Sequence, residues 1–157
     1  MKTRTLAAAM AALALTGAAG AQVTFVVPMS GAQEVAPVVG DPDGFGTATL
    51  TITPGSPPSI VWSIAAFNIQ LPPAAAHIHS GAAGVNGPVV VDFSAMLAGG
   101  PVFDADLANV LANPAGFYVN VHTPDHPGGA IRGQIPTPST IALLGLAGAA
   151  AARRRRR

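Results

Sequence analysis

The sequence of 157 residues contains no cysteine, and only 5% of its residues are aromatic. The absence of thiols excludes disulfide bonds, cysteine nucleophiles and zinc sites with cysteine ligands. Many small secreted domains depend on disulfides, so the stability of this chain has to come from an apolar core. The part between its two unusual ends is about 115 residues long, which is enough for one domain with a single core.

Basic residues are almost missing from the central part of the chain. Arg132 is the only lysine or arginine between residues 22 and 136, and all seven acidic residues lie in the same region. This region therefore has a formal net charge of −6, although the whole chain has +1. Nucleic-acid binding needs clustered cations that neutralise phosphates, so no nucleic-acid partner is expected. Arg132 is predicted to pair with Asp92 or Asp125 or to stack on an aromatic ring, rather than to guide a small anion toward a metal.

The N-terminus has the layout of a secretory signal peptide. Lys2 and Arg4 precede an apolar segment over residues 6–15, and Ala19 and Ala21 flank a glycine in the small-x-small pattern that signal peptidase recognises. Residues 1–21 are therefore predicted to be removed by signal peptidase. The mature domain is predicted to span residues 22–135.

The C-terminus has a second targeting layout over residues 136–157. Pro136, Thr137 and Pro138 precede an apolar segment over residues 141–152, and five arginines beginning at Arg153 end the chain. An apolar segment followed by cations is typical of insertion with the positive side in the cytoplasm. About 12 apolar residues are short for a stable transmembrane helix, which needs roughly 20. We expect transient membrane insertion, and the alternative is a short core helix with a solvated basic tail.

The central region reads as a series of short strands separated by glycine and proline turns. Residues 46–53 alternate strictly between threonine and apolar side chains, which predicts a strand with one buried face. A short strand is also expected over residues 32–35, and the one helix over residues 104–112, where two aspartates suit the helix N-terminus. Trp62 and Tyr118 are predicted to lie in the core. Many short strands with such turns predict an all-β antiparallel sandwich with one short helix.

Histidines lie in only two short segments of the chain. His77 and His79 are two residues apart on a predicted strand and therefore share one face. His122 ends another predicted strand, and Asp125 and His126 follow it in a turn. Should the two strands be neighbours, these side chains would form a metal site suited to zinc, copper or nickel. The alternative is that the histidines only form hydrogen bonds that hold the adjacent loops.

Two groups of motifs resemble the CHRD (chordin) domain family over residues 24–135. They are Ala-His-Ile-His-Ser-Gly with Asn-Gly-Pro-Val, over residues 76–90, and Tyr-Val-Asn-Val-His-Thr with Pro-Gly-Gly-Ala-Ile-Arg-Gly-Gln, over residues 118–134. The resemblance implies an immunoglobulin-like β-sandwich that is distantly related to copper/zinc superoxide dismutases. It implies that His77, His79 and His122 correspond to copper ligands and Arg132 to an arginine near the metal. The bridging histidine and the zinc-loop ligands have no counterpart.

The C-terminus resembles PEP-CTERM sorting signals, with Pro136, Thr137 and Pro138 in place of Pro-Glu-Pro. This resemblance implies cleavage by an exosortase-type membrane protease. It also implies release to the cell envelope or extracellular matrix of a bacterium.

Taken together, these features predict a secreted protein with a structural or binding role at the cell surface or in the matrix. Exopolysaccharide or surface proteins are the expected partners, and no residue is assigned to catalysis or to an organic cofactor. The alternative is a copper- or zinc-binding domain of oxidoreductase type that uses the three histidines. A third hypothesis is a binding module for another extracellular ligand.

Overall fold

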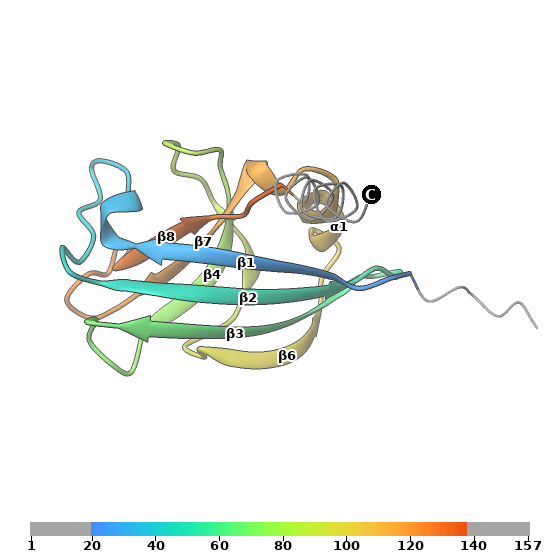
Figure 1. The fold of residues 1–157 in the computed structure, drawn as a ribbon, viewed down its shortest axis with the longest axis horizontal. Coiled ribbons are helices and arrows are strands. Elements are labelled where there is room, and N and C mark those ends of the chain that lie inside the picture. The colour runs from blue at the N-terminus through green and yellow to red at the C-terminus, as the bar shows by residue number, and fades with distance from the viewer. Residues whose placement is uncertain (1–19, 138–157) are drawn as a thin grey trace, which may run out of the picture.

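The computed structural model describes residues 20–137, which are built around one strongly curved β-sheet (Figure 1). The strands are β1 (Val23–Ser30), β2 (Phe45–Thr53), β3 (Ser59–Phe67), β4 (Ala75–Ser80), β5 (Val89–Asp92), β6 (Ala98–Phe103), β7 (Phe117–His122) and β8 (Ile131–Gln134). The short helix α1 (Leu107–Ala112) lies between β6 and β7 in the chain. Two 3-10 turns are also present, η1 (Gly31–Gln33) and η2 (Pro114–Gly116).

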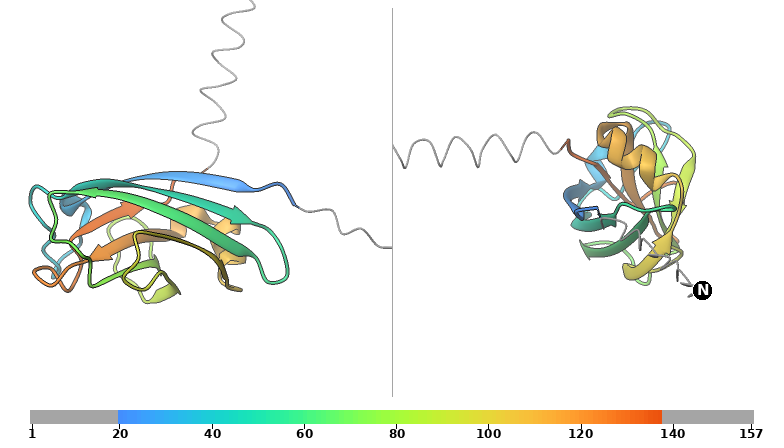
Figure 2. Two further views of the ribbon diagram at one scale, coloured as in Figure 1. Left: turned by 90° about the horizontal axis from the view of Figure 1, so that it is seen from below. Right: turned by 90° about the vertical axis from the view of Figure 1, so that its right-hand side faces the viewer.

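All paired strands are antiparallel, in the order β5-β4-β7-β8-β1-β2-β3-β6. The pairing between β1 and β8 is limited to Ser30 and Arg132, whereas β1 and β2 pair along their whole length. The sheet therefore curls at this junction into a half-barrel with two facing halves of four strands each (Figure 2). The predicted all-β antiparallel fold with one short helix is confirmed, and its two layers are parts of one continuous sheet.

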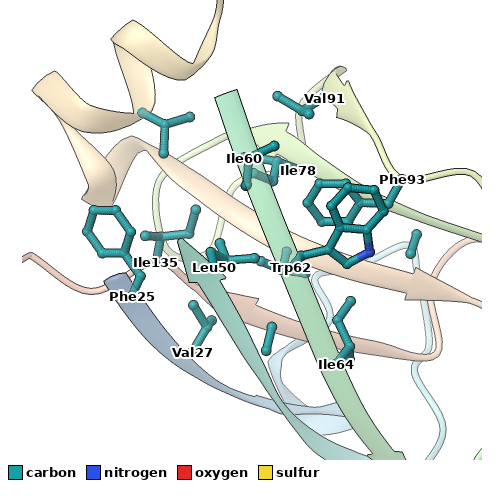
Figure 3. Packing of buried hydrophobic residues seen from close by; sticks show 14 of the residues in the cluster. Phe25, Val27, Leu50, Ile60, Trp62, Ile64, Ile78, Val91, Phe93 and Ile135 are labelled. Atoms are coloured by element: carbon teal, nitrogen blue, oxygen red, sulfur yellow. The ribbon is translucent and has the colours of Figure 1, made fainter. Parts of the chain in front are cut away.

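The core fills the space between the two halves (Figure 3). The alternation of β2 continues in its neighbours, so each of β1, β2 and β3 buries every second side chain. Trp62 stacks on Phe93 with ring centroids 4.3 Å apart, and its indole N–H donates to the carbonyl of Met96. The predicted core position of Trp62 is therefore confirmed. Helix α1 adds Leu107 and Val110 to the same cluster.

Three local predictions need correction. The strand expected over residues 32–35 is replaced by η1, because the chain turns tightly at Gly31, where a Cβ atom would come within 1.8 Å of the Asp41 carbonyl oxygen. Strand β6 was not predicted, because Gly99, Gly100 and Pro101 indicate a turn rather than a strand. It pairs with β3 through a bulge, where Gly100 has φ of +101°. The helix is also shorter than expected, since residues 104–106 form the turn that precedes it.

Several predicted targeting features lie outside the described residues. These are most of the signal peptide including Ala19, and Pro138, the apolar segment and the arginines from Arg153 onward. Ala21, Pro136 and Thr137 are described at the two ends of the domain. Between residues 20 and 137, no helix has the length and apolar character needed to cross a membrane.

Candidate metal centre

The pairing of β4 with β7 brings the three predicted ligands together. In this register His77 lies opposite Asn120, His79 opposite Tyr118, and Ala75 opposite His122. The alternate residues of both strands face the core, so the histidines share the opposite face of the sheet. One ring nitrogen of each histidine lies within 4.8 Å of those of the other two. Two imidazole nitrogens that bind one ion at about 2.0–2.1 Å are roughly 3.3–3.6 Å apart, so small ring movements close the site.

Hydrogen bonds fix which nitrogen of His79 and His122 carries the lone pair. Nδ1 of His79 lies 3.0 Å from the carbonyl oxygen of Gly87, and Nδ1 of His122 lies 3.1 Å from that of Pro127. A carbonyl oxygen only accepts, so the proton is on Nδ1 and the lone pair is on Nε2 in both rings. In His77 the arrangement is reversed, because Nε2 faces the Asp92 carboxylate at 3.6 Å. Such outer partners orient metal-binding histidines in many proteins.

The three remaining nitrogens are buried and have no hydrogen-bond partner among the described residues. They are Nδ1 of His77, Nε2 of His79 and Nε2 of His122. Buried polar atoms are nearly always paired, so three orphaned lone pairs on converging rings need an explanation. A metal ion bound to all three would satisfy them at once. The donor set of neutral imidazoles suits copper or zinc.

Burial keeps these rings neutral. Desolvation lowers the pKa of His77, His79 and His122 below the ordinary histidine value, and it is the largest influence on each. The Asp92 carboxylate opposes this for His77, as do the carbonyl groups of Gly87 and Pro127 for His79 and His122. Neutral imidazole is the form that binds metal.

The two weaker candidate ligands make other contacts. His126 directs Nδ1 to the carbonyl oxygen of Val39 at 3.2 Å, and its Nε2 lies 3.7 Å from the carboxylate of Asp41. Asp125 is exposed, and its backbone N–H donates to the side chain of Gln70. Neither belongs to the converging group formed by the three other histidines.

Arg132 stacks on an aromatic ring, which is one of the two arrangements predicted for it. Its guanidinium carbon lies 3.4 Å from the centroid of Tyr118. Its nitrogens donate to the side chain of Asn86 at 3.0 Å and to the carbonyl oxygens of Ala82 and Val85 at 3.3 and 2.8 Å. Arg132 therefore holds the loop of residues 81–88 over the sheet. This loop supplies the Gly87 carbonyl group that orients His79.

Tyr118 is buried, but on the face opposite the apolar core. Its ring stacks on His79 with centroids 4.9 Å apart and an angle of 10° between the planes. Its hydroxyl accepts a hydrogen bond from the backbone N–H of Gly87 at 3.2 Å. The predicted burial of Tyr118 is confirmed, but its ring lies outside the main apolar cluster, against His79, Arg132 and the loop of residues 81–88. Strand alternation places Tyr118 on the same face as His122.

A partly buried carboxyl group contacts Asn120, the residue that lies opposite His77 in the sheet. Glu34, at the end of η1, accepts a hydrogen bond from the side-chain amide of Asn120 at 3.5 Å. Burial raises the pKa of Glu34 to about 7, although the charge of Arg132 and the bond from Asn120 lower it in part. The oxygens Glu34 Oε1 and Asn120 Oδ1 are both buried without a partner among the described residues. A protonated Glu34 has an O–H donor, so the neutral form suits these surroundings.

Replacing Glu34 with glutamine tests this assignment. The folded state holds the proton of Glu34 more strongly than the unfolded state, so wild-type stability should fall relative to Glu34→Gln as pH rises from about 4.5 to about 7. We expect a relative loss of about 1–2 kcal/mol, since the group is only partly buried. Urea unfolding of both proteins at pH 5 and pH 8 measures it. A relative gain at pH 8 would show that Glu34 is ionised and held by Arg132.

The groups that support the histidines could not be predicted from the sequence. The carbonyl groups of Gly87 and Pro127 and the carboxylate of Asp92 come from loops and from an edge strand, whose positions depend on the tertiary fold. The side chain of Asn86 donates to the carbonyl of Val35 at 2.9 Å and thereby joins two loops that are far apart in the chain.

Comparison with known proteins agrees with the motifs of the two histidine segments. The family model of the CHRD domain matches residues 25–135. No curated protein and no solved structure matches the chain. The family match covers well over half of the sequence and includes every strand from β2 to β8. The chain therefore belongs to the CHRD domain family.

Proposed function

We propose that this CHRD domain protein binds one copper or zinc ion through His77, His79 and His122. The observation that carries the proposal is the convergence of three buried ring nitrogens that have no other partner among the described residues. Hydrogen bonds to fixed carbonyl groups already hold two of the rings in the tautomer that a metal requires.

Among the described residues, no fourth ligand converges with the three histidines. Three protein ligands are typical of catalytic zinc sites, which keep one position for water or substrate, whereas structural zinc sites have four. A bound copper ion would supply one-electron chemistry, and a bound zinc ion would act as a Lewis acid. The chain itself keeps the imidazoles neutral and orients them, and it limits solvent access on the side of His79.

The metal content of the purified protein tests the proposal. The protein should be prepared without a chelator or a histidine tag and analysed by elemental mass spectrometry. We expect near-stoichiometric copper or zinc, and one equivalent of Cu²⁺ or Zn²⁺ bound by the metal-free protein in calorimetry. A folded protein that takes up neither ion would show that the histidines are only structural.

The pH at which the metal is released follows from the burial of the three rings. Metal binding competes with protonation, and burial lowers the pKa of each ring below 6.5. The bound ion should therefore be retained at pH 6.5 and released only in more acidic solution. Retention measured by equilibrium dialysis from pH 8 to pH 4 checks this. Release that begins above pH 7 would contradict the neutral state assigned to the histidines.

We further propose that the chain is exported and acts at the cell surface or in the extracellular matrix, as its two terminal sequences suggest. A surface binding role is supported by the half of the sheet formed by β1, β2, β3 and β6. These strands contain no charged residue, and they expose the apolar side chains of Val26, Val61 and Phe103. Signal peptidase and an exosortase-type protease are the proposed processing partners. Cell fractionation with mass spectrometry of the mature ends tests this, and an intact chain in the cytoplasm would contradict it.

A further inference from the structure

The charged side chains around the candidate metal centre indicate whether cations or anions are attracted to it. Enzymes that act on small anions at a metal present a cation at the opening, where it raises the local anion concentration. Arg132 is the only lysine or arginine among the described residues, so it is the only permanent cation that this part of the chain offers for such a role.

Arg132 is not available to a ligand at the centre. Its side chain is only 2% exposed, and both terminal nitrogens donate to the loop of residues 81–88. The ring of Tyr118 also separates it from the histidines, because Tyr118 lies on the middle strand β7 and stacks on Arg132 of β8 and on His79 of β4. The hydrogen bonds of the guanidinium group are therefore used to hold the loop of residues 81–88.

The side of the centre that solvent reaches is acidic. His79 is buried beneath Tyr118 and the loop of residues 81–88, whereas 18% of the His77 side chain is exposed. The carboxylate of Asp92, which is 64% exposed, lies 3.6 Å from the ring of His77. Its Oδ1 atom also accepts the backbone N–H of Ser94 at 2.6 Å, so the group is held in place.

We infer that the ligand exchanged at this centre is the metal cation itself, which enters and leaves past Asp92, and that the centre does not recruit small anionic substrates. This inference rests on the metal centre proposed above. With six aspartates and one buried arginine, the described domain attracts cations and repels anions even when Glu34 is neutral. The carboxylate beside His77 provides the first contact for an arriving ion, and the three imidazoles then complete its coordination. A protein of this kind takes up, stores or hands over a metal.

Replacing Asp92 with asparagine tests the inference without disturbing the fold, since asparagine Oδ1 still accepts the Ser94 N–H. The association rate of Cu²⁺ with the metal-free full chain is measured by stopped-flow quenching of Trp62, the only tryptophan. We expect Asp92→Asn to slow association by about three- to tenfold at low salt, and this difference to shrink at about 0.5 M salt. The control is Asp104→Asn. Asp104 Oδ1 accepts the backbone N–H of Asp106, just as Asp92 Oδ1 accepts that of Ser94. The backbone N–H of Asp104, however, donates to Pro58 in the β2–β3 turn, so this aspartate belongs to another part of the domain.

Binding of azide to the copper-loaded protein provides a second measurement, with azide as a small anion. We expect weak azide binding in the wild type, and binding that is several-fold tighter in Asp92→Asn. Equal association rates for Cu²⁺ in wild type and Asp92→Asn would overturn the inference, as would tight azide binding that is indifferent to Asp92. Complete failure of the wild type to bind Cu²⁺ would refute the metal centre as well, so the two failures are distinguishable.

Discussion

Replacing His79 with alanine is expected to weaken copper or zinc binding by about two orders of magnitude or more. His79 is the most buried of the three converging histidines, and its Nδ1 atom is held by the Gly87 carbonyl. Removing it leaves two partly exposed imidazoles, which bind a metal ion far less tightly. A 100-fold weaker affinity removes about 2.7 kcal/mol of the stabilisation that saturating metal gives the wild type. Calorimetry and thermal unfolding with and without metal measure both effects.

His126→Ala is the matched control for this experiment. His126 also donates through Nδ1 to a backbone carbonyl, that of Val39, but it lies outside the converging group. We expect its removal to leave metal affinity within about twofold of the wild type. If His79→Ala instead lowers the stability of the metal-free protein by about 0.5–3 kcal/mol and leaves metal binding unchanged, His79 is a structural residue.

Part of the histidine cluster can be predicted from the sequence alone, and part of it cannot. The two-residue periodicity of a strand places His77 and His79 on one face, and the same rule places Tyr118 and His122 together on the other strand. What the sequence could not establish is that β4 pairs with β7, because some 40 residues and four other elements separate them in the chain. The pairing is a property of the whole sheet.

The predictions from sequence that needed correction failed for a similar reason, because tertiary pairing overrides local preference. Strand β6 contains Gly99, Gly100 and Pro101, and local chemistry favours a turn there, but pairing with β3 overrides it. Tyr118 is buried as predicted, but outside the main apolar cluster, where the cation of Arg132 and the ring of His79 lie against it.

The core should be most sensitive at Leu50. This side chain is completely buried at the centre of β2, between its strand neighbours Phe25 and Trp62. Leu50→Ala removes buried apolar contacts and leaves a cavity, which is expected to cost about 2–5 kcal/mol of unfolding free energy. For a domain of this size the loss corresponds to a fall of roughly 10 °C or more in Tm. Urea unfolding and calorimetry provide both numbers.

Thr49→Ala is the control. Thr49 precedes Leu50 and lies on the exposed face of the same strand, so its replacement should change the free energy of unfolding by at most about 0.5 kcal/mol. Leu50 belongs to β2, whereas the histidines belong to β4 and β7, but both halves of the sheet share one core. Leu50→Ala should therefore lower the unfolding midpoint in a single transition without changing metal affinity in the folded protein. Two separate transitions, or a loss below about 1 kcal/mol, would show that the halves do not depend on a common core.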